Sequence, residues 1–141
     1  MLSCYRVLDL TDERGDVAGF LLAQLGAEVI AVEPADGQGR RHSGPYAQGI
    51  AGPERSLGHW AYNRGKASVV LDDPAQLEAL AAGADVLLEC GALPVDLEAL
   101  RRHNPTLITV SLSPFGGDGP KAGWAATDLT LDAAKIGRAH V

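Results

Sequence analysis

The chain has 141 residues with 12 basic and 18 acidic side chains, and its net charge of −6 argues against nonspecific binding to nucleic acid or to an anionic membrane surface. Its 46% hydrophobic and 21% charged residues are typical of a globular domain, and the length suits one domain rather than two. The sequence contains no apolar run of membrane-spanning length and no signal-peptide pattern at its start, so we expect a cytoplasmic protein. Cys4 and Cys90 show no disulfide-framework spacing, and we expect both to be buried free thiols.

The first part of the chain alternates strand, helix and strand. Residues 5–10 and 27–33 are short apolar runs that predict strands, and residues 12–25 predict a helix capped by Thr11 or Asp12. Strand, helix and strand within about thirty residues form a βαβ unit, which predicts that the two strands are parallel. Apolar positions recur with helical spacing along the predicted helix, at Val17, Phe20, Leu21 and Leu25.

A long connection separates this unit from the rest of the chain. Residues 35–57 are rich in Gly, Pro, Ser and Arg and predict a long loop, which in a compact domain is usually functional or disordered. After a helical turn at 57–62, the alternation resumes with strands at 67–71, 84–89 and 106–112 and helices at 74–83, 95–103 and 124–134. The chain therefore predicts an α/β fold with a Rossmann-like, doubly wound, mainly parallel sheet of about five to six strands.

Positive charge, a glycine and the start of a strand coincide in the turn Asn63-Arg64-Gly65-Lys66. Such a turn either holds a phosphate or only caps the strand. Together with Arg40 and Arg41, Arg64 and Lys66 could form an anion site for a phosphorylated cofactor. The spacing is equally consistent with a second interpretation, in which these four side chains are solvated charges on loops.

In a sheet of this kind, ligands bind outside the carboxyl ends of the strands. A dinucleotide site would need a glycine-rich turn after the first strand, but Asp12 and Glu13 stand there and would repel a pyrophosphate. Glu33 ends the second strand, where a ribose-binding acid would lie, but alone it is a weak signal. The glycine-rich loop 113–120 lacks the Gly-Lys-Ser/Thr ending of a phosphate-binding loop and is equally well a mobile connection.

The remaining reactive side chains favour structural roles. The four histidines show no metal-ligand spacing with cysteine or acid, so no metal is expected. Cys90 stands at a strand end where a nucleophile could lie, but the sequence places no histidine to activate it, and a buried thiol is favoured. We expect His59 to pack or to make surface contacts, and Trp124 to lie in the core at a helix start.

Five segments, read together and in order, resemble the family III CoA-transferases. They are residues 7–11, 25–34, 63–72, 84–89 and 111–120. The resemblance implies an N-terminal Rossmann-like domain over residues 1–134 that binds coenzyme A, and acyl-CoA and a carboxylic acid as substrates. It also implies an interlocked homodimer of the full-length protein, with no nucleic acid or membrane partner.

The family's pattern places the coenzyme A contacts in the loops that follow the strands, with Arg64 and Lys66 as further candidate partners of the phosphates. The sequence departs from that pattern at Ala67, where an arginine is usual, and at residues 90–94, where many members carry Asn-Phe-Arg-Pro-Gly. The implied contacts are Arg14, Gly15, Pro34, Leu71, Asp72, Asp73, Cys90, Gly91, Ala92, Ala125, Ala126, Thr127 and Asp128.

The resemblance implies that the catalytic residue lies outside this sequence. The family's catalytic aspartate, which forms acyl anhydride and aspartyl-CoA thioester intermediates, lies downstream of Asp128 and beyond Val141. We therefore expect a truncated chain, inactive by itself, whose residues 135–141 are a non-native tail. A racemase of the same family would need a histidine where Thr127 stands, so a CoA-transferase is preferred. The alternatives are that racemase and a nucleotide-binding or interaction domain without chemistry.

Overall fold

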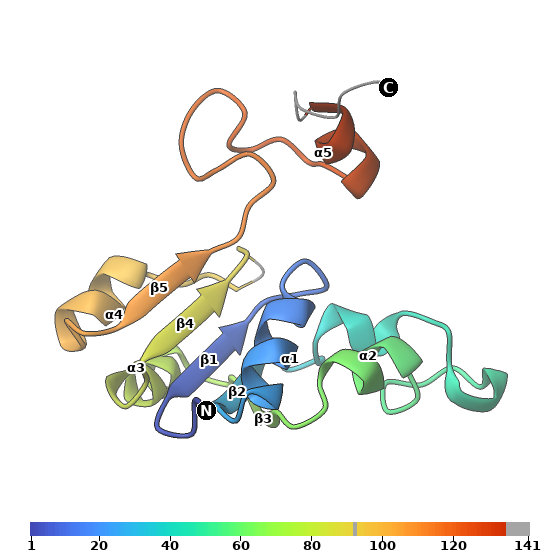
Figure 1. Cartoon of the computed structure of the whole chain (residues 1–141), viewed down its shortest axis with the longest axis horizontal. Coiled ribbons are helices and arrows are strands. Elements are labelled where there is room, and N and C mark those ends of the chain that lie inside the picture. The colour runs from blue at the N-terminus through green and yellow to red at the C-terminus, as the bar shows by residue number, and fades with distance from the viewer. Residues whose placement is uncertain (92, 135–141) are drawn as a thin grey trace.

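Figure 1 shows the computed structural model of the chain, which describes residues 1–91 and 93–134. Within these residues, one five-stranded sheet has the order β3-β2-β1-β4-β5, and every pairing in it is parallel. This confirms the predicted doubly wound α/β sheet. The strands are β1 (Arg6–Leu10), β2 (Glu28–Glu33), β3 (Ala67–Val70), β4 (Val86–Glu89) and β5 (Ile108–Ser111).

Helices cover both faces of the sheet, because successive strand residues point to opposite faces and both sets are apolar. On one face, α3 (Pro74–Ala82) and α4 (Leu97–His103) pack against the sheet, and on the other face α1 (Asp16–Gln24) does so (Figure 1). The α3 and α4 face buries Leu8, Leu10, Val32, Leu77, Leu87 and Leu100. The α1 face buries Val7, Val29 and Leu88, with Ala18 and Leu22 of the helix packed against them.

The connection between β2 and β3 contains more regular structure than the predicted long loop. The 3₁₀ turns η1 (Gly39–His42) and η2 (Ala47–Gly49) interrupt it. The helical turn predicted at 57–62 is confirmed as α2 (Leu57–Tyr62), which lies beside α1 (Figure 1). An antiparallel bridge joins Tyr46 to Ser56, and the Ser56 hydroxyl caps α2 by accepting a hydrogen bond from a backbone N–H. These local hydrogen bonds carry no hydrophobic periodicity, so the pattern of apolar residues did not predict them.

Helix α1 differs from its prediction in its cap and in its buried face. Gly15 occupies the N-cap, because Thr11 and Asp12 belong to a separate turn in which the Asp12 carbonyl accepts from the Gly15 N–H. The helix turns Ala18 and Leu22 toward the sheet. The apolar residues that the spacing singled out instead stay about half exposed: Val17 is 51%, Leu21 52% and Leu25 43% exposed.

Beyond β5 the chain leaves the sheet, and the last element of its described part is α5 (Asp128–Ala134) (Figure 1). The helix starts later than predicted, where Thr127 and Thr130 exchange hydrogen bonds. The expectation that Trp124 lies in the core is wrong: its side chain is 57% exposed and contacts the Phe115 ring edge-on. Cys90 is buried as expected, whereas Cys4 is exposed because it precedes β1. The expected tail at 135–141 lies outside the described residues.

A buried ion pair lies between α1 and the sheet. The Lys66 ammonium lies 2.8 Å from a carboxylate oxygen of Asp9, and both side chains are almost completely buried. Gly19 of α1 lies directly over this pair. A Cβ atom at Gly19 would come within 2.0 Å of Asp9 Oδ2 and 2.9 Å of Lys66 Nζ, so the helix reaches the sheet only with glycine at this position.

We predict that Gly19→Ala destabilises the protein. Alanine in place of glycine normally stabilises a helix by up to about 1 kcal/mol, but here the added methyl group would displace a buried ion pair, at a cost of about 1–3 kcal/mol. Urea unfolding measures the change. Gly117→Ala is the matched control, because no atom lies within 4 Å of the position of its added Cβ. A Gly19→Ala variant as stable as the wild type would contradict this packing.

Candidate functional site

The strand order creates a crevice at the carboxyl edge of the sheet. From β1 the chain winds outward through β2 and β3, then returns to the other side of β1 and continues through β4 and β5. The connections after β1 and β4 therefore diverge to opposite faces, and a doubly wound sheet binds its ligands between two such connections. In this chain, those two connections are the turn after β1 and the turn after β4, and the strand order therefore places the crevice between them.

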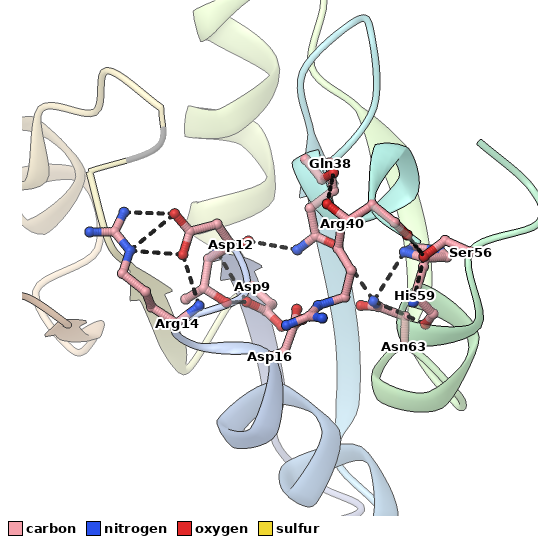
Figure 2. Close-up of polar contacts among 12 residues, drawn as sticks. Asp9, Asp12, Arg14, Asp16, Gln38, Arg40, Ser56, His59 and Asn63 are labelled. Carbon is pink, nitrogen blue, oxygen red and sulfur yellow. Dashed lines mark hydrogen bonds and ion pairs between the residues drawn. The ribbon is translucent and has the colours of Figure 1, made fainter. Parts of the chain in front are cut away.

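The turns after β1 and β4 are tied together by Arg14. Its guanidinium donates to both carboxylate oxygens of Asp12, from Nε to Oδ1 at 2.9 Å and from Nη2 to Oδ2 at 2.7 Å (Figure 2). Nη2 also donates to the backbone carbonyl of Cys90 at 2.9 Å, and the Asp12 N–H donates to the Cys90 sulfur at 3.2 Å. These contacts fix the position of the Arg14 head group at the crevice.

The contacts also set the charge states at the crevice. Burial by itself raises the pKa of Asp12, but the hydrogen bonds from Arg14 outweigh it, and the pKa lies below its ordinary value. Burial raises the pKa of the Cys90 thiol. At neutral pH the site therefore presents an ionised Asp12–Arg14 pair and a neutral thiol.

Three cavities open at this edge of the sheet. The largest, about 440 Å³, is lined by Arg14, Cys90, Ser113, Pro114, Ala122 and residues 123–126. A second cavity of about 220 Å³ shares Arg14, Pro114 and Ala126 and adds Leu112 and Leu131. A third, of about 310 Å³, lies over the ends of β1 and β2 and is lined by residues including Thr11, Asp12, Pro34, Gln38 and Leu93.

A buried network fixes the connection between β2 and β3 beside the third cavity. Glu33 accepts two hydrogen bonds from Arg41, at 2.6 and 2.8 Å, and others from the Ser68 hydroxyl and the Gln38 N–H. The Gln38 side-chain amide donates to the Thr11 carbonyl at 2.7 Å. Because these partners surround the Glu33 carboxylate, it is not open to a ribose hydroxyl, which removes the remaining feature of a dinucleotide site.

The comparison with known proteins identifies the family. The model of CoA-transferase family III matches residues 2–141. The chain belongs to CoA-transferase family III. It is 35% identical over 142 residues to the succinyl-CoA:(R)-benzylsuccinate CoA-transferase subunit BbsE of Thauera aromatica, a match that covers 93% of this chain and 35% of BbsE. It is 37% identical over 145 residues to the succinate–glutarate CoA-transferase of Agrobacterium fabrum, covering 92% of this chain and 36% of that enzyme.

The fold of this family III chain is also found in a solved structure. A CAIB/BAIF family protein from Brucella suis superposes with a TM-score of 0.81 and 33% sequence identity, over 94% of this chain and 38% of that one. The chain thus spans little more than a third of the length of the relatives that it matches.

The family III chain brings four of the implied coenzyme A contacts into one cavity: Arg14, Cys90, Ala125 and Ala126 line the 440 Å³ space. Pro34 lines the 310 Å³ cavity beside it. The sequence did not single out Gln38, Leu112 or Pro114, which also line these cavities. Gln38 carries no signal because it lies in an irregular stretch, whereas the glycine-rich loop that contains Pro114 did mark a connection at the carboxyl edge.

Six other implied contacts do not line the three cavities: Gly15, Leu71, Asp72, Asp73, Gly91 and Thr127. Leu71 packs against the main core, the Asp72 N–H donates to Gln76, and Asp73 caps α3 by accepting from the Ala75 N–H. Gly15 caps α1 beside Arg14, Gly91 follows Cys90 with a positive φ of 77°, and Thr127 and Asp128 start α5. Ala92 lies outside the described residues.

Arg40, Arg41, Arg64 and Lys66 do not form an anion site, which was one of the two interpretations of their spacing. Arg40 pairs with Asp16, Arg41 with Glu33 and Glu54, and Lys66 with Asp9, so none of these three is a solvated loop charge either. The Lys66 ammonium is buried and therefore not open to a phosphate. Arg64 precedes β3 and thus lies toward the amino edge, where its guanidinium stacks on the Phe20 ring at 5.3 Å.

His59 is buried, as the packing interpretation predicts, and burial lowers its pKa. Its ring contacts Asn63 at 3.1 Å (Figure 2). Within residues 1–91 and 93–134, no group of three or more His, Cys, Asp or Glu side chains is placed to hold a metal ion. None of the helices in that same part of the chain has the length and apolar character needed to cross a membrane.

We predict that Glu33 makes the stability of the protein dependent on acid pH. Burial raises the pKa of Glu33, but the hydrogen bonds from Arg41, Ser68 and Gln38 lower it from 4.5 to about 2. As the pH falls, the Glu33 carboxylate takes up a proton at a higher pH in the unfolded chain than in the folded one. The stabilisation that ionised Glu33 provides is therefore complete above pH 4.5 and is lost as the pH falls toward 2. The loss is about 3 kcal/mol.

Urea unfolding at a series of pH values compares the wild type with Glu33→Gln and with Glu98→Gln, which changes an exposed carboxylate. The Glu33→Gln variant is expected to be less stable at pH 6 and to show a flatter pH dependence. The Glu98→Gln variant should follow the wild type. Parallel curves for the wild type and Glu33→Gln would contradict the role assigned to Glu33.

Proposed function

We propose that the protein transfers coenzyme A from an acyl-CoA to a free carboxylic acid, and that coenzyme A lies along the carboxyl edge of the sheet. The observation that carries the proposal is the cavity between the turns after β1 and β4, where Arg14, Cys90, Ala125 and Ala126 meet. Membership of CoA-transferase family III supports the reaction class. The adjoining cavity at Pro34 offers room for a further part of an elongated cofactor.

The proposed reaction needs a carboxylate nucleophile, and we propose that it is the aspartate implied by the family's pattern. That aspartate would attack the thioester carbonyl, release the thiolate of coenzyme A and form an acyl anhydride. The thiolate would then attack the aspartyl carbonyl and release the donor acid, and the aspartyl-CoA thioester would pass coenzyme A to the acceptor acid through a second anhydride. The residues described in this chain would bind and orient the cofactor.

We propose that the acids exchanged carry two carboxyl groups. The two relatives named above act, by their names, on benzylsuccinate, succinate and glutarate, all of which are dicarboxylic acids. The complete protein would work as a homodimer. The apolar side chains of Val17, Leu21 and Trp60 are about half exposed, and an assembly that covered them would be stabilised by their burial.

Two other functions make different predictions. A racemase of the family would exchange the proton at the carbon next to the thioester, and Thr127, which cannot act as a base at neutral pH, stands where its histidine is expected. A nucleotide-binding or interaction domain without chemistry would bind coenzyme A and never release a new thioester.

The test uses the protein expressed from its complete gene. It is incubated with succinyl-CoA and unlabelled glutarate, or with other acyl-CoA and acid pairs, and the thioesters are separated and weighed by mass spectrometry. The proposal predicts that a thioester of the added acid appears as the donor thioester disappears. Deuterium uptake from heavy water next to the thioester, without transfer, would favour the racemase. Absence of any new thioester or deuterium uptake across the panel would favour the binding-only function.

Hydroxylamine tests the covalent intermediate separately. Added after acyl-CoA, it would convert an aspartyl thioester to a hydroxamate, which peptide mass spectrometry detects as a mass change on one aspartate. Transfer that proceeds without any modified aspartate would reject the covalent pathway while leaving the reaction class in place.

A further inference from the structure

We infer that Arg14 is the residue that selects dicarboxylic substrates, by binding the carboxylate that does not react. The inference rests on the proposed function and assigns one part of it to a particular side chain. It depends on how the guanidinium of Arg14 is held and on the chemistry of the two cavities that it lines.

The guanidinium is fixed by three acceptors that leave one nitrogen unused. Nε and Nη2 donate to the Asp12 carboxylate, and Nη2 donates in addition to the Cys90 carbonyl. Nη1 makes no hydrogen bond to the described part of the chain, and Figure 2 shows the third nitrogen of the head group pointing away from Asp12. Both hydrogens of Nη1 can therefore be offered to a ligand without any change in the position of Arg14.

In the part of the chain that the structure describes, Arg14 is the charged partner that the surrounding cavities offer to a carboxylate. Among the described residues that line the 440 and 220 Å³ cavities, Arg14 is the one with a charged side chain. The others are small or apolar, such as Pro114, Ala126 and Leu131, or carry a neutral hydroxyl or thiol. A carboxylate that enters this space gains a charge-assisted hydrogen bond to Arg14, whereas a methyl group in its place does not.

Asp12 positions Arg14 without blocking it. Its two oxygens contact Nε and Nη2, on the side of the guanidinium away from Nη1. Because arginine has five N–H donors in a planar head group, it can bridge two carboxylates. The ion pair also keeps the empty site close to neutral, so a monocarboxylic acid of the same length would not be repelled. Discrimination between a dicarboxylic and a monocarboxylic acid would come from the additional hydrogen bonds that Arg14 donates to the second carboxylate.

The other cations near the carboxyl edge are not placed for this role. Arg41 is held by Glu33 and Glu54, and the Lys66 ammonium is buried against Asp9. Arg40 pairs with Asp16, and its guanidinium lies over the Tyr62 ring at 5.2 Å, away from these cavities. Lys121 is near the 440 Å³ cavity, but its ammonium lies over the Trp124 and Phe115 rings, at 5.3 and 5.9 Å, and its side chain does not line the cavity. Among these cations, Arg14 is the one whose side chain lines both cavities.

The experiment compares acids of equal chain length in the protein expressed from its complete gene. Succinate is set against butyrate and glutarate against valerate as acceptors, with one acyl-CoA donor, and kcat/KM is measured for each. A hydrogen bond to a charged group contributes about 1.5–3 kcal/mol, so the wild type should prefer the dicarboxylic acids by about 10- to 100-fold.

Arg14→Met should lower kcat/KM for succinate and glutarate by about 10- to 100-fold, the same factor as the preference of the wild type. For butyrate and valerate, it should lower kcat/KM by less than about fivefold. Arg14→Lys keeps the charge and should fall between the wild type and Arg14→Met. Arg102→Met removes an exposed charge from α4 and should behave as the wild type. Circular dichroism establishes that each variant is folded, and the preference of the wild type tests the inference even if a variant is not.

The experiment distinguishes a failure of the proposed function from a failure of the inference about Arg14. If no acid accepts coenzyme A from any donor, the proposed function fails. If transfer occurs but the wild type does not prefer the dicarboxylic acids, the inference about Arg14 and the proposed dicarboxylic substrates are both overturned, while the transfer of coenzyme A stands. If the wild type prefers them but Arg14→Met lowers kcat/KM equally for both acids of a pair, the inference about Arg14 alone is overturned.

Discussion

The buried ion pairs between the sheet and the connection from β2 to β3 are the constraint on which the rest of this structure depends. Lys66 pairs with Asp9, and Arg41 pairs with Glu33, so two carboxylates at or near the ends of adjacent strands are each neutralised by a cation from the same connection. Removing one partner of such a pair leaves a buried charge without compensation, at a cost of about 3–5 kcal/mol. The connection therefore has to lie where it does for the sheet to bury these acids.

This constraint shapes the candidate site in two ways. It brings Gln38 over the turn after β1, where its amide holds the Thr11 carbonyl and helps to form the wall of the cavity at Pro34. It also neutralises three cations of the connection, because Arg40, Arg41 and Lys66 each have an acidic partner. Arg14 is the charged side chain among the described residues that line the 440 and 220 Å³ cavities, and we assign the selection of charged substrates to it.

The sequence predicted the architecture well because the determinants of a doubly wound sheet are local. Apolar runs such as 27–33, separated by helical patterns, lead to parallel strands, and parallel strands place their following loops at one edge. That reasoning places Arg14, Pro34 and Cys90 at the carboxyl edge, where the structure has them. Resemblance to a known family supplied the ligand, which spacing alone did not.

The errors have physical causes that a single sequence does not display. Ion pairs such as Lys66 with Asp9, 57 residues apart, leave no periodic signal, so a basic turn that stabilises the fold resembled an anion site. The position of Arg64 before β3, rather than after it, already placed it away from the carboxyl edge, and this argument was open to sequence reasoning. The buried face of α1 was misassigned because Ala18 and Gly19, which approach the sheet, are weaker hydrophobic signals than Val17 and Leu21.

Hydrogen–deuterium exchange of the protein expressed from its complete gene, with and without coenzyme A, tests the location of the site most directly. The account predicts that the cofactor slows exchange at residues 11–15 and 113–126, on either side of the crevice between β1 and β4, and leaves residues 63–66 unchanged. Slower exchange centred on residues 63–66, with no change around Arg14, would contradict it.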